Sequence, residues 1–287
     1  DGVVILSFEK PERFSQGQQS MLSDIMDYRI HWKPLRFTEG LGFMGKLWDL
    51  SRMYFWSFYL ANKYTTQVVH ARGHAPAQVG LFLKRVLKKK LIFDFRGLWV
   101  DERIDKGGWD LSNFFHRLQY KYFKRVEKKL LAQADQIVVL TNKVVSEVVK
   151  LGASPPSKIT VIPCCADFNH FPLLTDISIL EAKTLTGIPD NAFVLGYLGS
   201  VGDMYMLDHL FHLYELTKNV RDDYHLLIIT QDITALEDLM KRYLKPHLHS
   251  FIHIKSASRD DVPRLLPAIS IMVSFISPSY ARIAASP

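Results

Sequence analysis

The chain has 287 residues, 48% hydrophobic and 23% charged, which is a globular balance and enough length for about two domains. Lysines and arginines outnumber acidic residues by 36 to 29, so the net charge of +7 favours anionic partners such as phosphates, nucleotides or acidic lipid surfaces. The only cysteines are adjacent, Cys164 and Cys165, which excludes a disulfide framework and favours a reducing compartment. The sequence contains no run of eighteen apolar residues, so no transmembrane helix is predicted.

The first half of the chain alternates predicted strands and helices. Short apolar runs predict buried strands at 3–8, 68–70, 91–95, 137–140 and 159–162. Residues 29–37 also predict a strand, although Pro34 is unfavourable inside a sheet. Long helices are predicted at 46–64 and 111–132, and a shorter one at 142–151. This alternation indicates a parallel sheet with helices on both faces.

The predicted helix at 46–64 is dense in aromatic side chains, and two interpretations stay open. It packs on the sheet as a core helix, or it lies at a membrane interface, where aromatic residues concentrate. Asp49 and Arg52 argue against full insertion. Basic residues at 84–90 and along 111–132 are either solvated or in contact with anionic lipid headgroups.

The second half repeats the alternation. Strands are predicted at 194–198, 225–229, 251–254 and 269–275. Helices are predicted at 207–218, 234–243 and 262–266. Two successive doubly wound units predict an α/β fold with two Rossmann-like domains, which we place at 1–175 and 176–287.

A glycine turn follows the first strand of the second half. The run 194–198 is broken by Gly199-Ser200-Val201-Gly202, and a helix begins near Met206. Strand, glycine turn and helix together aim free backbone N–H groups at an anion. We expect Gly199 and Gly202 to adopt positive φ and to let a phosphate approach the backbone. A Gly-x-x-Gly after a strand is also an ordinary turn, so the interpretation depends on the rest of the chain.

The sequence predicts no metal site. His247 and His249 are two residues apart and His209 and His212 are three apart, but no cysteines or carboxylates cluster with them. Nucleic-acid binding is not expected either, because the basic residues lie along separate helices without the aromatic interleaving of stacking platforms.

Four stretches, taken in order, resemble the retaining glycosyltransferases of the GT-B fold, of the family 4 or group 1 type. The first runs from ADQIVVLTNKVV through KITVIPCCADFNHF, at 134–171, and the second is GIPDNAFVLGYLGSVGDMY, at 187–205. The others are DVPRLLPAISIMVSFISPSYARIAASP, at 261–287, and FDFRGLWVDERIDKGGW, at 93–109. The resemblance implies an N-terminal acceptor-side domain at 1–175 and a nucleotide-sugar donor domain at 176–287, both incomplete at the chain termini.

Site residues follow from the same resemblance. Those expected at the donor diphosphate are Gly199, Ser200, Gly202, Tyr205, Ser279, Arg282 and Ser286. The guanidinium of Arg282 can neutralise charge that builds on a leaving phosphate. His70 and Arg72 occupy the segment in which relatives place a catalytic histidine. Arg96, Asp101 and Glu102 are expected on the acceptor side, or alternatively in a salt-bridged surface loop, and His74 is expected to be a helix-start residue.

The resemblance implies transfer of a sugar from a nucleotide-diphosphate sugar to a hydroxyl acceptor with retention, in cell-surface polysaccharide or glycolipid synthesis. No metal or other cofactor is expected, and the partners are the nucleotide sugar, a glycan or lipid-linked acceptor and an anionic membrane surface. A cytoplasmic location, peripheral on the inner face of the plasma membrane, fits these partners.

The sequence departs from the family in two places. The basic pair that relatives carry after the first donor-domain strand is replaced by residues around Asp203 and Met204, and the downstream Thr-Lys-x-x-Glu pattern is not present. We therefore expect an internal fragment that is poorly active alone. A non-catalytic nucleotide-sugar-binding relative and a GT-B-like nucleotide-sugar epimerase remain as alternatives.

Overall fold

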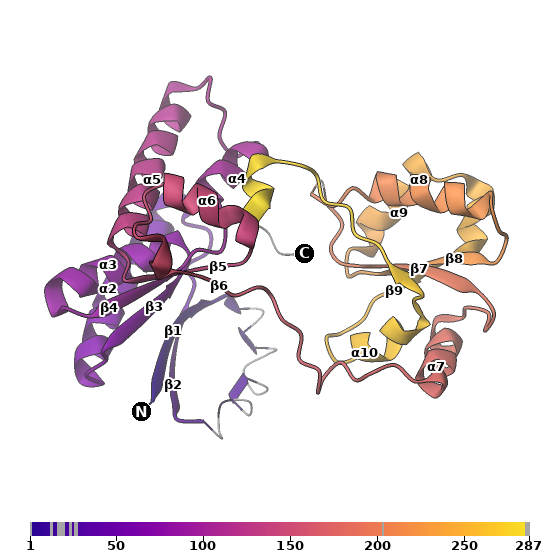
Figure 1. Cartoon of the computed structure of the whole chain (residues 1–287), viewed down its shortest axis with the longest axis horizontal. Coiled ribbons are helices and arrows are strands. Elements are labelled where there is room, and N and C mark those ends of the chain that lie inside the picture. Colours follow the sequence, from indigo (N-terminus) through magenta and orange to yellow (C-terminus); the bar gives the residue numbers. More distant parts are fainter. Residues whose placement is uncertain are drawn as a thin grey trace. The chain divides into compact units, whose positions relative to one another are not determined.

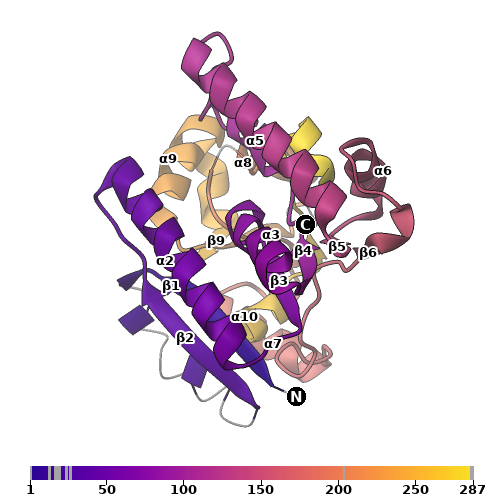
Figure 2. The same cartoon turned by 90° about the vertical axis from the view of Figure 1, so that its left-hand side faces the viewer.

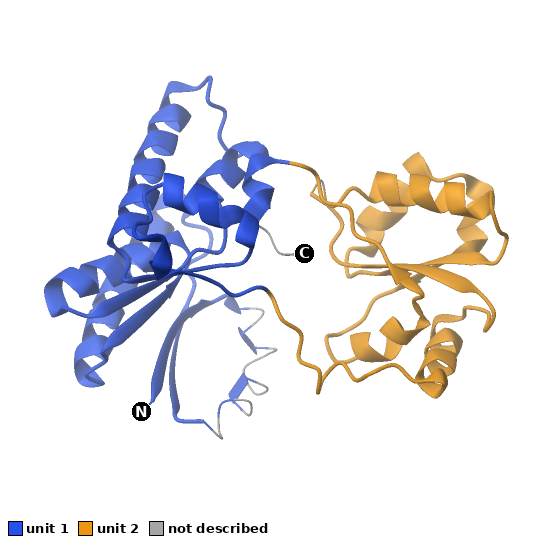
Figure 3. Cartoon of the chain, in the orientation of Figure 1, with its two compact units in different colours: residues 1–163, 279–286 blue, residues 164–278, 287 orange. Residues whose placement is uncertain are grey.

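The computed structural model describes residues 2–11, 14–15, 21–22, 25, 28–202 and 204–284. The chain divides into two compact units, one comprising residues 1–163 and 279–286 and the other residues 164–278 and 287 (Figure 3).

This division differs from the predicted boundary after residue 175. Residues 164–175 form no helix or strand and are mostly exposed, so the first unit ends at Pro163. The C-terminal 3₁₀ helix η4 (Tyr280–Ala284) returns to the first unit, because Ala281 and Ala284 are buried in its core.

The strands of the first unit form two parallel sheets (Figure 1). The smaller sheet pairs β1 (Val3–Glu9) with β2 (Ile30–Arg36). The larger sheet has its four strands in chain order: β3 (Val68–Arg72), β4 (Lys90–Asp94), β5 (Gln136–Val139) and β6 (Ile159–Val161). The strands predicted in this half are confirmed. Pro34 lies inside β2, where one side of the strand is unpaired among the described residues and needs no N–H donor.

Three helices of the first unit pack side by side (Figure 2). They are α2 (Gly42–Lys63), α3 (His74–Leu87) and α5 (Phe114–Gln133). Gly80 brings α3 close to the sheet, since a Cβ there would lie 2.6 Å from Leu91 Cδ1. The core beneath contains fully buried Phe93 and Ile137.

Two shorter helices and a 3₁₀ turn complete this unit. α6 (Asn142–Lys150) is capped by the Thr141 side chain, which accepts from the Val144 N–H, and η1 covers Pro156–Lys158. α4 (Trp99–Asp105) lies where the sequence predicts a loop, so that prediction is wrong. The buried side chains of Leu98 and Val100 anchor it.

The second unit contains one parallel sheet, whose strand order is β10-β7-β8-β9. Its strands are β7 (Phe193–Leu198), β8 (Tyr224–Ile229), β9 (Ile252–Lys255) and β10 (Ile271–Met272). The first three match the predicted runs, but β10 is much shorter than the predicted 269–275. Gly196 in β7 has no room for a side chain, because a Cβ would lie 2.4 Å from Ile269.

Three helices of the second unit agree with the predicted ranges, namely α8 (Leu207–Lys218), α9 (Ile233–Tyr243) and α10 (Val262–Leu265). The unit also contains α7 (Asp176–Thr186) and the 3₁₀ helices η2 (Pro246–Phe251) and η3 (Leu266–Ala268). A buried cluster that includes Phe211, Tyr214 and Ile228 joins α8 to β8. The two units confirm the predicted α/β class with parallel sheets.

Candidate functional site

In the first unit, the carboxyl ends of β3 and β4 bring several predicted residues together. Arg72 is the last residue of β3 and pairs in register with Asp94, the last residue of β4. Gly73 follows with φ +82° and donates its N–H to the Asp94 carbonyl oxygen at 3.0 Å. Glycine suits this conformation, and α3 starts immediately after it. The free N–H groups of the first turn of α3 therefore lie at the carboxyl edge of the sheet, where α/β folds bind ligands.

Asp94 is the centre of this edge. The residue is only 6% exposed, and its Oδ2 lies 3.8 Å from Nε2 of His70, whose side chain is 60% exposed. Its Oδ1 lies 4.0 Å from a terminal guanidinium nitrogen of Arg96. Oδ1 is buried and has no hydrogen-bond partner among the described residues. A buried carboxylate oxygen without a donor is costly, so this group is poised to order neighbouring donors.

Sequence reasoning missed Asp94 and found its neighbours His70, Arg72 and Arg96. The available indication was an acidic residue ending the apolar run Leu91-Ile92-Phe93, at the edge where ligands bind.

Asp101 is held in a network within the first unit. Its two oxygens accept from Tyr120 Oη and Lys124 Nζ, each at 3.0 Å. Lys124 also donates to fully buried Glu127, whose other oxygen lies 3.0 Å from His74 Nε2. Burial would lower the pKa of Lys124, but Glu127 and Asp101 outweigh that effect and raise it. The network joins α3, α4 and α5 and leaves Asp101 8% exposed.

Glu102 pairs with a residue of its own helix, since it forms an i,i+4 ion pair with Lys106 at 3.1 Å. An exposed pair of this kind contributes little stability. Both carboxylates thus have partners inside the first unit.

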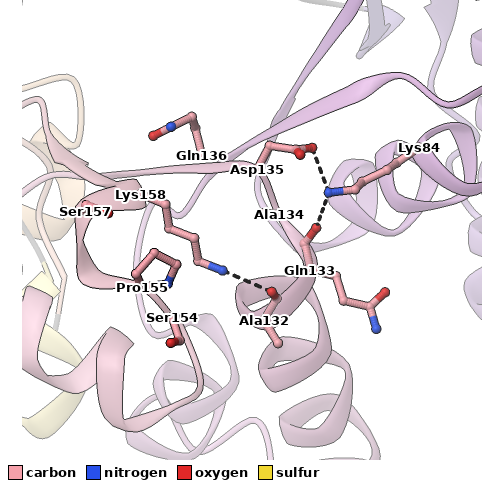
Figure 4. A pocket seen from close by; sticks show the side chains of 10 residues that line it. All are labelled: Lys84, Ala132, Gln133, Ala134, Asp135, Gln136, Ser154, Pro155, Ser157 and Lys158. Carbon is pink, nitrogen blue, oxygen red and sulfur yellow. Dashed lines mark hydrogen bonds and ion pairs between the residues drawn. The ribbon is translucent and has the colours of Figure 1, made fainter.

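A pocket at the other end of the same sheet is lined by charged side chains that already have partners (Figure 4). Lys84 Nζ donates to the Gln133 carbonyl at 2.7 Å and pairs with Asp135 at 2.8 Å, and Lys158 Nζ donates to the Ala132 carbonyl at 3.0 Å. These lysines satisfy the last carbonyls of α5. Because the pocket lies where β5 begins, it is separate from the carboxyl edge.

In the second unit, the glycines of the loop between β7 and α8 do not have the backbone conformation that we expected. Neither Gly199 nor Gly202 has positive φ, so that prediction is wrong. Gly199 is needed for space, because a Cβ would lie 2.8 Å from the hydroxyl of Tyr197. That hydroxyl donates to the Ser200 carbonyl at 2.7 Å, and burial, then Tyr205, raises the pKa of Tyr197 to about 12.

The loop keeps two backbone donors for a ligand. The Gly199 N–H donates to Ile229 and the Val201 N–H to the Asp232 carboxylate at 2.9 Å. Within the described chain, the N–H groups of Ser200 and Gly202 donate to no acceptor. They follow the carboxyl end of β7, as the phosphate interpretation requires.

Tyr205 connects this loop to the segment after β10. It forms an antiparallel bridge with Ile276, and the Ser277 N–H donates to the Met204 carbonyl at 2.9 Å. α8 begins at Leu207, close to the predicted start, and Asp208 lies in its first turn. A carboxylate there already occupies the favourable field of the helix N-terminus.

Two further residues expected at the diphosphate, Ser279 and Arg282, lie in the C-terminal segment around η4. Ser279 and Arg282 belong to the first unit, where Thr141 Oγ1 donates to the Ile283 carbonyl at 2.7 Å and Tyr280 Oη donates to Glu147 at 2.9 Å. Ser279 Oγ and Arg282 Nε are buried and have no partner among the described residues. Ser286 lies outside the described residues.

Two kinds of site are absent among the described residues, a metal-binding cluster and a membrane-spanning helix. No group of three or more histidines, cysteines and carboxylates there is arranged to hold a metal ion. None of the described helices combines the length and apolarity needed to span a bilayer.

Residues 3–170 match the model of the family described as Glycosyltransferase Family 4. No curated protein matches the sequence.

Solved structures of low sequence identity share the fold. A glycosyltransferase from Rickettsia africae has a TM-score of 0.64 and 15% identity, covering 96% of this chain and 73% of its own. Anabaena HepE, in complex with UDP and glucose, has a TM-score of 0.62 and 12% identity, covering 96% and 74%. WaaG, a glycosyltransferase involved in lipopolysaccharide biosynthesis, has a TM-score of 0.61 and 15% identity, covering 97% and 77%. The two-unit α/β fold is that of the GT-B structures.

Proposed function

The chain belongs to glycosyltransferase family 4, and we propose on that premise that it moves a sugar from a nucleotide-diphosphate sugar to a hydroxyl acceptor with retention at the anomeric carbon. The observation that carries the proposal is the family match over residues 3–170, joined to a second unit whose first strand ends in a loop with free N–H groups. The HepE structure holds UDP and glucose, which supports a nucleoside-diphosphate sugar as the donor.

For the donor, we assign the diphosphate to the Gly199–Gly202 loop. The Ser200 and Gly202 N–H groups donate to phosphate oxygens, and the charge on the leaving diphosphate is offset by backbone dipoles rather than by a metal. Arg282 and Ser279 stay in the proposal through their unpartnered atoms, which an anion would satisfy. We propose the same role for Ser286 and a packing role for Tyr205 beside the nucleotide.

For the acceptor, we assign the edge formed by His70, Arg72, Asp94 and Arg96. In the reaction, the acceptor oxygen forms a bond to the anomeric carbon on the face from which the diphosphate leaves, as retention in a single displacement requires; the bond from that carbon to the diphosphate breaks, and the acceptor hydroxyl loses its proton. His70 is exposed, lies beside Asp94 and is our candidate to receive that proton. Asp101 and Glu102 support the acceptor side indirectly, by holding α4.

We further propose that the acceptor is a glycan or lipid-linked sugar, and that the protein works in cell-surface polysaccharide or glycolipid synthesis on the cytoplasmic face of a membrane. WaaG offers a structural parallel, as a glycosyltransferase involved in lipopolysaccharide biosynthesis.

The test is release of nucleoside diphosphate from a panel of nucleotide sugars, with and without lipid-linked acceptors. We expect release that requires an acceptor and that falls about 100-fold in His70→Asn, a change typical of losing a general base. His212→Asn, at an exposed position on α8, is the matched control and should leave the rate unchanged. Equal rates in the two variants would refute the role of His70.

The alternative is a non-catalytic protein that binds nucleotide sugar. The sequence favours it at the loop after β7, where residues around Asp203 and Met204 replace the basic pair of relatives. This alternative would be favoured if calorimetry showed that a nucleotide sugar binds while no acceptor leads to release of nucleoside diphosphate. A change of the donor sugar without an acceptor would instead favour an epimerase.

A further inference from the structure

Helix α5 carries a one-sided set of charges. Glu127 is its only acidic residue, and that side chain is fully buried against His74 and Lys124. The other cations of the helix have no carboxylate within ion-pair distance in the part of the chain that the structure describes; they are Arg117, Lys121, Arg125, Lys128 and Lys129. A helix face with uncompensated positive charge requires an anionic partner or solvent.

Large apolar side chains on the first half of α5 are also exposed. Phe114, Phe115, Leu118 and Tyr122 are each more than half exposed. Phe114, Leu118 and Tyr122 are spaced four residues apart and lie on one side of the helix, opposite buried Glu127. An exposed row of this kind is unusual on a monomeric surface and marks an interaction site.

Helix α2, which packs on α3 as α5 does, carries further exposed aromatic side chains. Tyr122 lies close enough to Tyr54 of α2 that it adds to the effect of burial in raising the pKa of Tyr54. On α2, Phe55 and Tyr59 are 65% and 45% exposed. Figure 2 shows α2, α3 and α5 side by side in the first unit.

We propose that the α5 face, defined by Phe114, Phe115, Leu118, Tyr122, Arg125 and Lys129, binds the headgroup region of an anionic lipid bilayer. Its aromatic end enters the interface while its cations contact lipid phosphates, the arrangement of helices that lie on membranes. The proposal rests on the proposed function, which places the protein at a membrane, and it identifies the surface that contacts the lipid.

A bilayer fits this surface better than a nucleic acid. Single-stranded nucleic acids are held in grooves in which aromatic rings stack on successive bases beside backbone-tracking cations. Within the α5 face as defined above, the apolar side chains lie at positions 114–122 and the cations at Arg125 and Lys129. Leu118 within the row has no face on which a base can stack.

The test is co-sedimentation of the 287-residue chain with vesicles of equal parts phosphatidylglycerol and phosphatidylcholine, against pure phosphatidylcholine. We expect binding only to the anionic vesicles. Each cation near an anionic surface contributes about fivefold in affinity, so Arg125→Gln with Lys129→Gln should weaken binding about 25-fold. Lys241→Gln with Arg242→Gln on α9 removes the same charge from an exposed part of the other unit and should have little effect.

A second variant tests the apolar half. Phe115→Ser with Leu118→Ser should lower binding to anionic vesicles while leaving the charge unchanged, and circular dichroism should show an intact fold because both side chains are exposed. Equal loss in the α5 and α9 charge variants, or equal binding to both kinds of vesicle, would overturn the proposal. So would α5-dependent binding of a single-stranded oligonucleotide without binding to vesicles. Because the assay uses neither donor nor acceptor, its failure would leave the proposed glycosyl transfer untouched.

Discussion

Replacing Gly199 by alanine tests how the donor loop is built. The backbone at Gly199 is not left-handed, so alanine adds no backbone strain. Its Cβ, however, would lie 2.8 Å from the hydroxyl oxygen and 3.1 Å from Cζ of Tyr197. Tyr197 is only 2% exposed and donates to the Ser200 carbonyl, so the ring has little room to move. Overpacking of this kind costs ~1–3 kcal/mol, and we expect a loss of about 2 kcal/mol in the free energy of unfolding.

A double-mutant cycle with Tyr197→Phe isolates the cause. Phenylalanine lacks the oxygen that the new Cβ would meet, although it removes the hydrogen bond to Ser200, at a cost of about 1 kcal/mol. In that background, Gly199→Ala should cost at least ~1 kcal/mol less than in the natural sequence. Urea denaturation followed by circular dichroism measures the four free energies.

Gly202→Ala is the control, because a Cβ at Gly202 meets nothing within 4 Å. It should change the free energy of unfolding by less than about 0.5 kcal/mol. A coupling energy near zero between positions 197 and 199 would refute the steric account. A large loss in Gly202→Ala would refute the distinction between the two glycines.

Substitutions of Asp94, Asp101 and His225 provide three more tests. Asp94→Asn keeps the side-chain shape but removes the charge beside His70, so release of nucleoside diphosphate should fall about tenfold or more, whereas an unchanged rate would exclude Asp94 from the site. Asp101→Asn should cost ~1–3 kcal/mol in urea denaturation without changing KM for the acceptor, and a changed KM with unchanged stability would restore a direct acceptor role. Burial, then His253 at 3.0 Å, lowers the pKa of His225 from 6.5 to about 4. The unfolded chain therefore takes up this proton first, so the free energy of unfolding should fall as pH drops from 6.5 toward 4, and His225→Phe should flatten that fall in urea titrations.

Local sequence was sufficient where a segment is buried on both faces. The runs at 194–198 and 225–229 predict strands, and the structure has β7 at Phe193–Leu198 and β8 at Tyr224–Ile229. Their side chains are almost all buried, so an unbroken apolar run is the only pattern that such strands can carry.

Local sequence was insufficient where distant contacts decide. α4 contains Asp101 and Glu102, for which a surface loop was expected, and its N-cap residue Leu98 makes no side-chain cap. The helix is held instead by tertiary contacts, such as that of Asp101 with Tyr120. The return of η4 to the first unit likewise depends on burial of Ala281, which the sequence around it does not encode.

The candidate site also combines features that local sequence predicts with features that distant contacts decide. The sequence located His70, Arg72 and Arg96 at strand ends because the strands themselves were predictable. Asp101 was expected on the acceptor side from the family resemblance alone, and the local sequence does not show its partners Tyr120 and Lys124, which lie about twenty residues away on α5. The sequence also assigned positive φ to Gly199, where the actual constraint is the hydroxyl of Tyr197.

The most direct test of the central claim is to follow backbone amide resonances while UDP is added to the chain. The account predicts the largest shifts at Ser200 and Gly202, whose N–H groups have no acceptor among the described residues, and smaller ones at Gly199 and Val201, whose N–H groups already have acceptors. Binding that leaves the amides of this loop unshifted, or no binding of any nucleoside diphosphate, would contradict the claim that this loop holds the donor.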